Sequence, residues 1–190
     1  YLIATNGGRL QPLTIAWDVH RKRWFHLYPH ETAPPGDVMH WSGRDQTANT
    51  MCIACHTTGY EKRYDAATDS FDTRWKEPNV SCQACHGPGS AHVAWAAGPG
   101  ARTYAAGGSA ASGVAAASAP SKGAAPRFGL TMDFAASGHA AQVEVCAACH
   151  ARRSELTGTQ TAGTPLLDEF MPARLDAGLY HADGQQQGEV

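Results

Sequence analysis

Residues 1–40 alternate short apolar segments with turn residues. Apolar, aromatic and β-branched side chains dominate residues 1–5, 9–17 and 24–28, and an Asn-Gly-Gly sequence and a charged turn separate these segments. This pattern is typical of short antiparallel strands joined by tight turns. Prolines follow the last segment and end the pattern, because proline lacks the amide hydrogen that a strand donates. We therefore expect a small β-meander over residues 1–40.

Residues 41–95 contain a second pattern of this kind. Residues 60–64 and 71–75 are rich in aromatic side chains and flank a polar turn at 65–69. Aromatic pairs across two strands stabilise a hairpin, so we expect a hairpin here rather than a separate binding site. The aromatic residues are Tyr60, Tyr64, Phe71 and Trp75.

The second half of the chain begins with a segment of low complexity. In residues 96–126, 26 of the 31 positions are Ala, Gly, Ser or Pro. Glycine and proline break the helix that alanine favours, so we expect a loosely ordered loop. A helix is expected over residues 140–153, and the tail from residue 166 shows little periodicity. The chain is then one domain, or a fragment of a larger one, with the regions 1–40, 41–95, 96–126 and 127–190.

The apolar composition is thin for a chain of this length. Leu, Ile, Val and Phe together number 26 of 190 residues, which is below the ~20% at which a side-chain core becomes hard to build. The formal net charge of −2 is too small to favour disorder, and it indicates neither nucleic acid nor an anionic membrane as a partner. We therefore expect another group to fill the interior.

All six cysteines lie in three copies of one pattern, Cys-x-x-Cys-His. This is the attachment signature of c-type haem, in which both thiols bond to the macrocycle and the histidine ligates the iron. Two intervening residues place the sulfurs about one helical turn apart, so we expect a short helix at each motif. The thioether residues are then Cys52, Cys55, Cys82, Cys85, Cys146 and Cys149, and the proximal iron ligands are His56, His86 and His150.

Other uses of cysteine fit this pattern less well. A Cys-x-x-Cys pair can be half of a zinc site or a redox dithiol, and six cysteines in a small exported chain can form three disulfides. Two pairs could make one zinc site, but the third pair would be left over. None of these uses explains the histidine after every second cysteine. We therefore expect three haem c groups as cofactors.

Covalent haem also predicts the compartment. Haem is joined to cytochrome c on the outer side of the energised membrane, so we expect a periplasmic or extracellular protein. Residues 1–5 lack the charged region of a signal peptide, which suggests that a leader has been removed or that further sequence precedes them. No segment approaches the ~20 apolar residues of a membrane span.

Four segments resemble a known family. They are Trp-Phe-His-Leu-Tyr-Pro at 24–29, the second motif with its Gly-Pro-Gly-Ser-x-His continuation at 79–93, the third motif at 145–153, and Gly-Leu-Tyr-His-Ala-Asp-Gly at 178–184. The chain resembles the exported multihaem c-type cytochromes that are often fused to tetratricopeptide repeats and are related to the tetrahaem electron-transfer cytochrome of nitrifiers. The resemblance covers about residues 1–96 and 140–190. It implies electron transfer, and members usually carry further haem motifs on both sides.

Axial ligation separates a carrier from an enzyme. An iron with two strong protein ligands has no site for a substrate, whereas a catalytic haem keeps one position open. Histidines outnumber methionines, so we expect two histidines on each iron. His26 lies on a predicted strand, where a histidine is usually a packed side chain, but the family resemblance favours a role as an iron ligand. The distal candidates, in falling order, are His92, His26, His40 and His181.

The remaining candidates have ordinary interpretations. His20 and His30 are expected in solvent, and His139 is left undecided. Arg152 and Arg153 follow the third motif directly, where they are either partners of haem propionates or ordinary arginines near a helix end.

We therefore expect a mostly irregular multihaem cytochrome with short helices at the haem motifs, small β-hairpins and a core formed by haems. Its expected function is electron transfer through closely stacked haems, with redox proteins and further cytochrome chains or haem domains as partners. We expect His181 or His26 to face a haem from another chain or from sequence outside this one. Two alternatives stay open: an enzyme domain of nitrite- or hydroxylamine-type chemistry, which needs a five-coordinate haem, and a subunit of an extracellular cytochrome filament.

Overall fold

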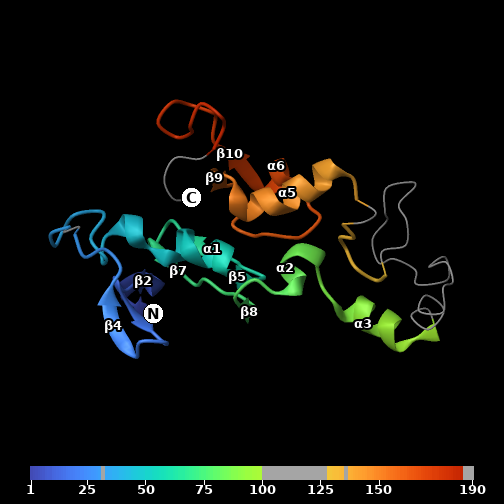
Figure 1. Ribbon diagram of the computed structural model, residues 1–190, viewed down its shortest axis with the longest axis horizontal. Coiled ribbons are helices and arrows are strands. Elements are labelled where there is room, and N and C mark those ends of the chain that lie inside the picture. The colour runs from blue at the N-terminus through green and yellow to red at the C-terminus, as the bar shows by residue number, and fades with distance from the viewer. Residues whose placement is uncertain (31–32, 100–127, 135–136, 186–190) are drawn as a thin grey trace.

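The structure is a computed structural model and describes residues 1–30, 33–99, 128–134 and 137–185 (Figure 1). Within these residues, the chain forms short helices and five two-stranded antiparallel sheets. This confirms the expected combination of short helices and small hairpins. Residues 100–126 of the expected Ala/Gly-rich loop lie outside the described residues.

The N-terminal region forms two hairpins instead of one continuous meander. Strand β1 (Leu2–Ala4) pairs with β2 (Leu10–Pro12), and β3 (Ile15–Asp18) pairs with β4 (Arg23–His26). The single strand expected over residues 9–17 is therefore broken into two. The pairing with β1 ends where Leu13 donates its amide hydrogen to the carbonyl of Tyr1 over 3.1 Å, and the residues from Ile15 onward pair with β4 instead.

Strand pairing between the first two motifs brings their helices together. A 3-10 turn, η3 (Ala48–Thr50), leads into helix α1 (Cys52–His56), and strand β5 (Thr57–Thr58) follows at once. Strand β8 (Glu77–Pro78) pairs with β5 and stands just before helix α2 (Cys82–His86). The amide of Asn79 donates to the carbonyl of His56 over 2.9 Å. Residues 59–76 therefore form a loop whose two ends meet, and the end of α1 lies near the start of α2.

The loop of residues 59–76 contains the hairpin expected from the aromatic pattern. Strands β6 (Tyr64–Asp65) and β7 (Ser70–Phe71) pair around the turn, and Glu61 bridges to Arg74. The rings of Tyr64 and Phe71 lie 4.7 Å apart between centroids, as a cross-strand aromatic pair does. The prediction of a hairpin over residues 60–75 is confirmed.

The third motif ends the longest described helix, α5 (His139–His150). Helix α3 (Ser90–Ala97) precedes the part of the chain that lies outside the description. The helix expected to reach residue 153 stops at His150, because residues Arg153–Glu155 form strand β9. Helix α6 (Leu166–Glu169) and strand β10 (Phe170–Pro172) follow, and β10 pairs with β9.

The tail is therefore more ordered than its weak periodicity suggested. Phe170 is only 2% exposed, and its ring packs against the guanidinium of Arg153. A single large apolar residue that packs on a charged partner produces no repeat in the sequence, so the pattern did not reveal it.

The described side-chain core is small. Its fully buried apolar members include only one aliphatic residue larger than alanine, Ile53, besides one methionine and two aromatic residues. Many large apolar side chains are exposed instead, among them Trp24, Phe25 and Leu27. No helix in the described part of the chain combines the length and the apolar character needed to cross a membrane. The buried apolar residues are Ala48, Ile53, Ala54, Tyr60, Met132, Ala148 and Phe170.

Candidate cofactor-binding site

Each Cys-x-x-Cys-His motif forms one turn of helix, as its spacing predicted. The first motif is the whole of α1, the second is the whole of α2, and the third is the last turn of α5. In every motif the first cysteine is exposed and the second is half-buried. Each helix therefore presents a pair of sulfurs on adjacent turns, with the second sulfur on the inner side.

The first and third motifs lie against each other. Helix α5 lies beside α1 in Figure 1, and the Sγ atom of Cys55 is 3.9 Å from the carbonyl oxygen of Cys149. The second motif is close as well. Burial raises the pKa of the Cys85 thiol, and the neighbouring thiols of Cys146 and Cys149 raise it further. The three motifs therefore converge, although long segments of chain separate them.

One large cavity opens between the three motifs. Its volume is about 1400 Å³, which exceeds the roughly 300–1,000 Å³ of an ordinary small-molecule pocket. Side chains from all three motif helices line it, and so do exposed apolar residues such as Leu27, Tyr28 and Met39. The motif cysteines and histidines that line it are Cys52, Cys55, His56, Cys85, Cys146, Cys149 and His150.

This arrangement fits covalently attached haem. None of the six cysteines, all of which lie in the described residues, is in a disulfide. The same described residues contain no group of three or more His, Cys, Asp or Glu side chains placed to hold a metal ion directly. The sulfurs instead belong to three helices, and five of the six cysteines border a shared space. That placement suits a large group held by two thioethers and one histidine at each motif.

The histidine of the second motif, an expected proximal ligand, is held in one orientation. The Nδ1 atom of His86 is 2.9 Å from the carbonyl oxygen of Met132, and its ring meets that of Phe134 edge to face at 5.0 Å. A ligating histidine commonly donates one ring N–H to a backbone carbonyl, which leaves the other nitrogen for the metal. His86 and Cys82 are not among the described residues that line the cavity. Only part of the second motif therefore borders the large cavity, and a haem held there would lie at its margin.

Two distal candidates, His26 and His40, line the cavity. The Nδ1 atom of His26 accepts the amide hydrogen of Tyr28 over 3.0 Å, and the Nδ1 atom of His40 accepts that of Ser42 over 3.3 Å. In a neutral imidazole an accepting Nδ1 leaves the proton on Nε2. Ligation of iron through Nε2 would therefore require this hydrogen-bonding arrangement to change.

The other two distal candidates lie away from the cavity. His92 is on α3, where its Nδ1 is 2.7 Å from the carbonyl oxygen of Phe128 and its ring stacks on Trp95. This is the same backbone anchoring that His86 has, so Nε2 is again the nitrogen left for a metal. His181 is exposed in the tail, where its amide donates to the carbonyl of Gln185. The structure does not bring His92 and His181 together with the cavity.

Glycine makes the position of His92 possible. Gly129 has a φ of +77°, and a Cβ atom there would lie 2.6 Å from the backbone of Ala91. Only a residue without a side chain lets the chain pass this close to α3 and direct the carbonyl of Phe128 at His92.

Two polar side chains contact the sulfurs of the first and third motifs. The guanidinium of Arg153 donates to Sγ of Cys55 over 3.8 Å, and the amide of Gln160 donates to Sγ of Cys149 over 3.5 Å. The sequence interpretation considered Arg153 only as a propionate partner or a helix-end arginine, and it did not single out Gln160. Neither residue has a local signal, because each reaches a cysteine through the folding of the chain.

These contacts perturb the thiols. A hydrogen bond from Cys55 lowers the pKa of Cys149 to about 6, with further lowering by Gln160 and Arg153. The same hydrogen bond raises the pKa of Cys55, and burial adds to the rise. Where both thiols are free, Cys149 is therefore the more acidic of the two.

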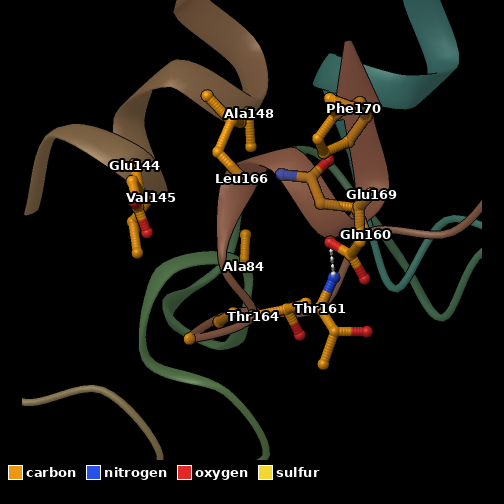
Figure 2. A pocket seen from close by; sticks show the side chains of 12 residues that line it. Ala84, Glu144, Val145, Ala148, Gln160, Thr161, Thr164, Leu166, Glu169 and Phe170 are labelled. Carbon is orange, nitrogen blue, oxygen red and sulfur yellow. Dashed lines mark hydrogen bonds between the residues drawn. The ribbon is translucent and has the colours of Figure 1, made fainter. Parts of the chain in front are cut away.

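A second, much smaller hollow lies where α2, α5 and α6 meet (Figure 2). Its volume is about 10 Å³, which is the size of one water molecule. The carboxylate of Glu169 accepts the amide hydrogen of Thr161 over 3.0 Å, and Ala84, Ala148 and Phe170 close the space. The residues around this hollow pack the segment that contains Gln160 against α5.

The sequence model of the family cytochrome c554 and c-prime matches residues 16–87. The matched segment contains the first two Cys-x-x-Cys-His motifs and spans less than half of the chain. The match supports a c-type cytochrome, with covalently bound haem, bound iron and electron transport. No curated protein and no solved structure matches the chain.

Proposed function

We propose that the protein is an electron carrier that holds three haem c groups close together. The observation that supports this best is the single cavity of about 1400 Å³ that is lined by cysteines of all three motifs. Three separate haem sites would not require the motifs to converge. A shared space allows neighbouring macrocycles to approach each other, as stepwise electron transfer requires.

The chain's own residues attach and orient the groups. The paired cysteines on α1, α2 and the end of α5 form the thioethers, and His56, His86 and His150 are the proximal ligands. His26 and His40 are the distal ligands placed nearest the shared space, while His92 and His181 serve haems at its margin or in another chain. Bound haem iron supplies one-electron oxidation and reduction.

The same groups complete the fold. The large apolar side chains along the cavity, among them Leu27, Tyr28 and Met39, are exposed and have little protein to pack against. Burying apolar surface contributes roughly 25 cal/mol per Å². A haem that covers these side chains therefore adds stability that the thin side-chain core does not supply.

The compartment and the partners follow from the same chemistry. We place the protein in the periplasm or outside the cell, where haem is joined to cytochrome c. Its partners are redox proteins, including further cytochrome chains or haem domains. The relationship to exported multihaem cytochromes with tetratricopeptide repeats is part of this proposal.

Mass spectrometry and electron paramagnetic resonance test the proposal. The denatured holoprotein should carry three covalent haems, and the oxidised protein should show only low-spin ferric iron. Fewer than three haems in fully matured protein would contradict the cofactor assignment. A high-spin signal together with rapid binding of cyanide or nitrite would favour the enzyme over the carrier.

A further inference from the structure

A group of charged and polar side chains is buried directly behind the first and third motifs. The side chain of Arg153 is 9% exposed and that of Glu155 is 6% exposed, and both belong to β9. Lys62 and Tyr60, from the loop of residues 59–76, both contact the carboxylate of Glu155. Electron transfer through the haems does not by itself require this cluster, and burying charge costs free energy.

Arg153 is held in one orientation. Its Nε donates to the carbonyl oxygen of Ala148 over 2.6 Å, and its guanidinium lies 4.1 Å from the ring centroid of Phe170. With these two contacts in place, Nη2 donates to Sγ of Cys55 over 3.8 Å. The charge of Arg153 therefore lies at a fixed distance from a sulfur that attaches haem.

The cluster neutralises this charge only in part. The nearest carboxylate oxygen, Oε1 of Glu155, is 4.0 Å from Nη1 of Arg153. The other oxygen of Glu155 pairs with Nζ of Lys62 at 3.0 Å and lies 3.5 Å from the hydroxyl of Tyr60. Two cations and one anion leave one positive charge in a poorly solvated place, where electrostatic effects are stronger than in water.

We infer that Arg153 raises the reduction potential of the haem attached through Cys55, and so makes this haem the electron acceptor for the other two. This inference rests on the proposed function. A fixed positive charge stabilises the state with one more electron, and a charge in a poorly solvated place acts strongly on a nearby redox centre. The transfer moves one electron: the donor iron is oxidised from ferrous to ferric, the acceptor iron is reduced from ferric to ferrous, and no group is released.

Of the three half-buried motif sulfurs, all of which lie in the described residues, that of Cys55 is the one that receives a hydrogen bond from the guanidinium. Cys149 accepts a hydrogen bond from the neutral amide of Gln160. The pKa of Cys85 is raised by burial and by neighbouring thiols, with no cation among the causes. The charge of Arg153 also acts on Cys149, so within the described residues it is the direct guanidinium contact that distinguishes the first motif from the third.

An optical redox titration of the purified holoprotein tests the inference with two opposite substitutions. Arg153→Gln removes the positive charge and should shift the highest of the three midpoint potentials downward. Glu155→Gln removes the negative charge that faces Arg153 and should shift the same potential upward. A purely structural disturbance has no reason to move the potential in opposite directions.

Two further variants serve as controls. Arg153→Lys keeps the charge and should retain most of the wild-type potential. Arg174→Gln makes the same change in formal charge at a side chain that is 87% exposed, and it should leave all three potentials unchanged. If Arg153→Gln does not mature, Glu155→Gln still tests the inference, because an unchanged or lowered potential in that variant would overturn it.

The haem count separates the two proposals. Each variant is first analysed by mass spectrometry for three covalent haems. Three haems with a highest potential that does not respond to Arg153→Gln would overturn the role of Arg153 and leave the carrier intact. Fewer than three haems in the wild-type protein would overturn the proposed function itself.

Discussion

The sulfur of Cys55 lies 3.9 Å from the carbonyl oxygen of Cys149, although 94 residues separate the two cysteines. This contact makes the first and third motifs immediate neighbours in space. The first and second motifs are linked through the pairing of β5 with β8. Ala84 of the second motif and Ala148 of the third line the same small hollow, so each motif has both of the others as neighbours.

Loss of one attachment sulfur should weaken the fold as well as the redox centre. In Cys85→Ala, one thioether of the second haem is missing, and the folding free energy that binding contributes is reduced. We expect a lower melting temperature of the holoprotein, measured by circular dichroism. Val93→Ala, which trims an exposed side chain, is the matched control. An unchanged melting curve for Cys85→Ala would contradict the prediction.

Removal of a histidine that lines the cavity should open a coordination position. In His26→Ala or His40→Ala, we expect a high-spin ferric signal and cyanide binding that the wild-type protein lacks. His20→Ala should keep the low-spin spectrum, because His20 lies in an exposed turn and does not line the cavity. If both cavity variants keep a purely low-spin spectrum, neither histidine is a distal ligand.

Gly129→Ala should destabilise the segment that holds His92. The new Cβ would meet the backbone of Ala91 at 2.6 Å, and the φ of +77° is strained for any residue with a side chain. Such strain costs about 1–3 kcal/mol, which chemical unfolding can measure. Gly138→Ala is the matched control, since its φ is −60° and no atom of the described residues lies within 4 Å of the added Cβ. Equal stability losses in the two variants would contradict this account.

Tyr60 should make the protein less stable at alkaline pH. Its hydroxyl donates to the carbonyl oxygen of Asn49 over 2.6 Å, and burial raises its pKa, with a further rise from Glu155. Above the unfolded tyrosine pKa of about 10, the unfolded chain releases a proton that the folded chain retains. Stability is therefore fully present below that pH and falls as the pH rises.

Tyr60→Phe isolates this effect. The substitution should lower the free energy of unfolding by about 1–3 kcal/mol at neutral pH, because the carbonyl of Asn49 loses its hydrogen-bond donor. It should also reduce the loss of stability above about pH 10. Denaturant unfolding across the pH range measures both, with Tyr1→Phe as the control at an exposed ring. A Tyr60→Phe variant with the wild-type alkaline slope would argue against ionisation of this residue.

Local features of the sequence predicted much of the secondary structure. The spacing of cysteine and histidine predicted a helical turn at each motif, and the aromatic alternation around residues 65–69 predicted a hairpin. Both depend on residues only a few positions apart. The break after Pro12 and the strand β10 were not foreseen, because a change of strand partner depends on what the rest of the chain offers.

The sequence by itself determined the chemistry: three pairs of thiols, each followed by a histidine, and too few large apolar residues for an ordinary core. Only the tertiary structure decided which motifs are neighbours, which histidines face the shared cavity, and that Arg153 contacts Cys55. These relationships join residues far apart in the chain. The physical reason is that strand pairing, burial and the path of the backbone place such residues, and no local spacing encodes that path.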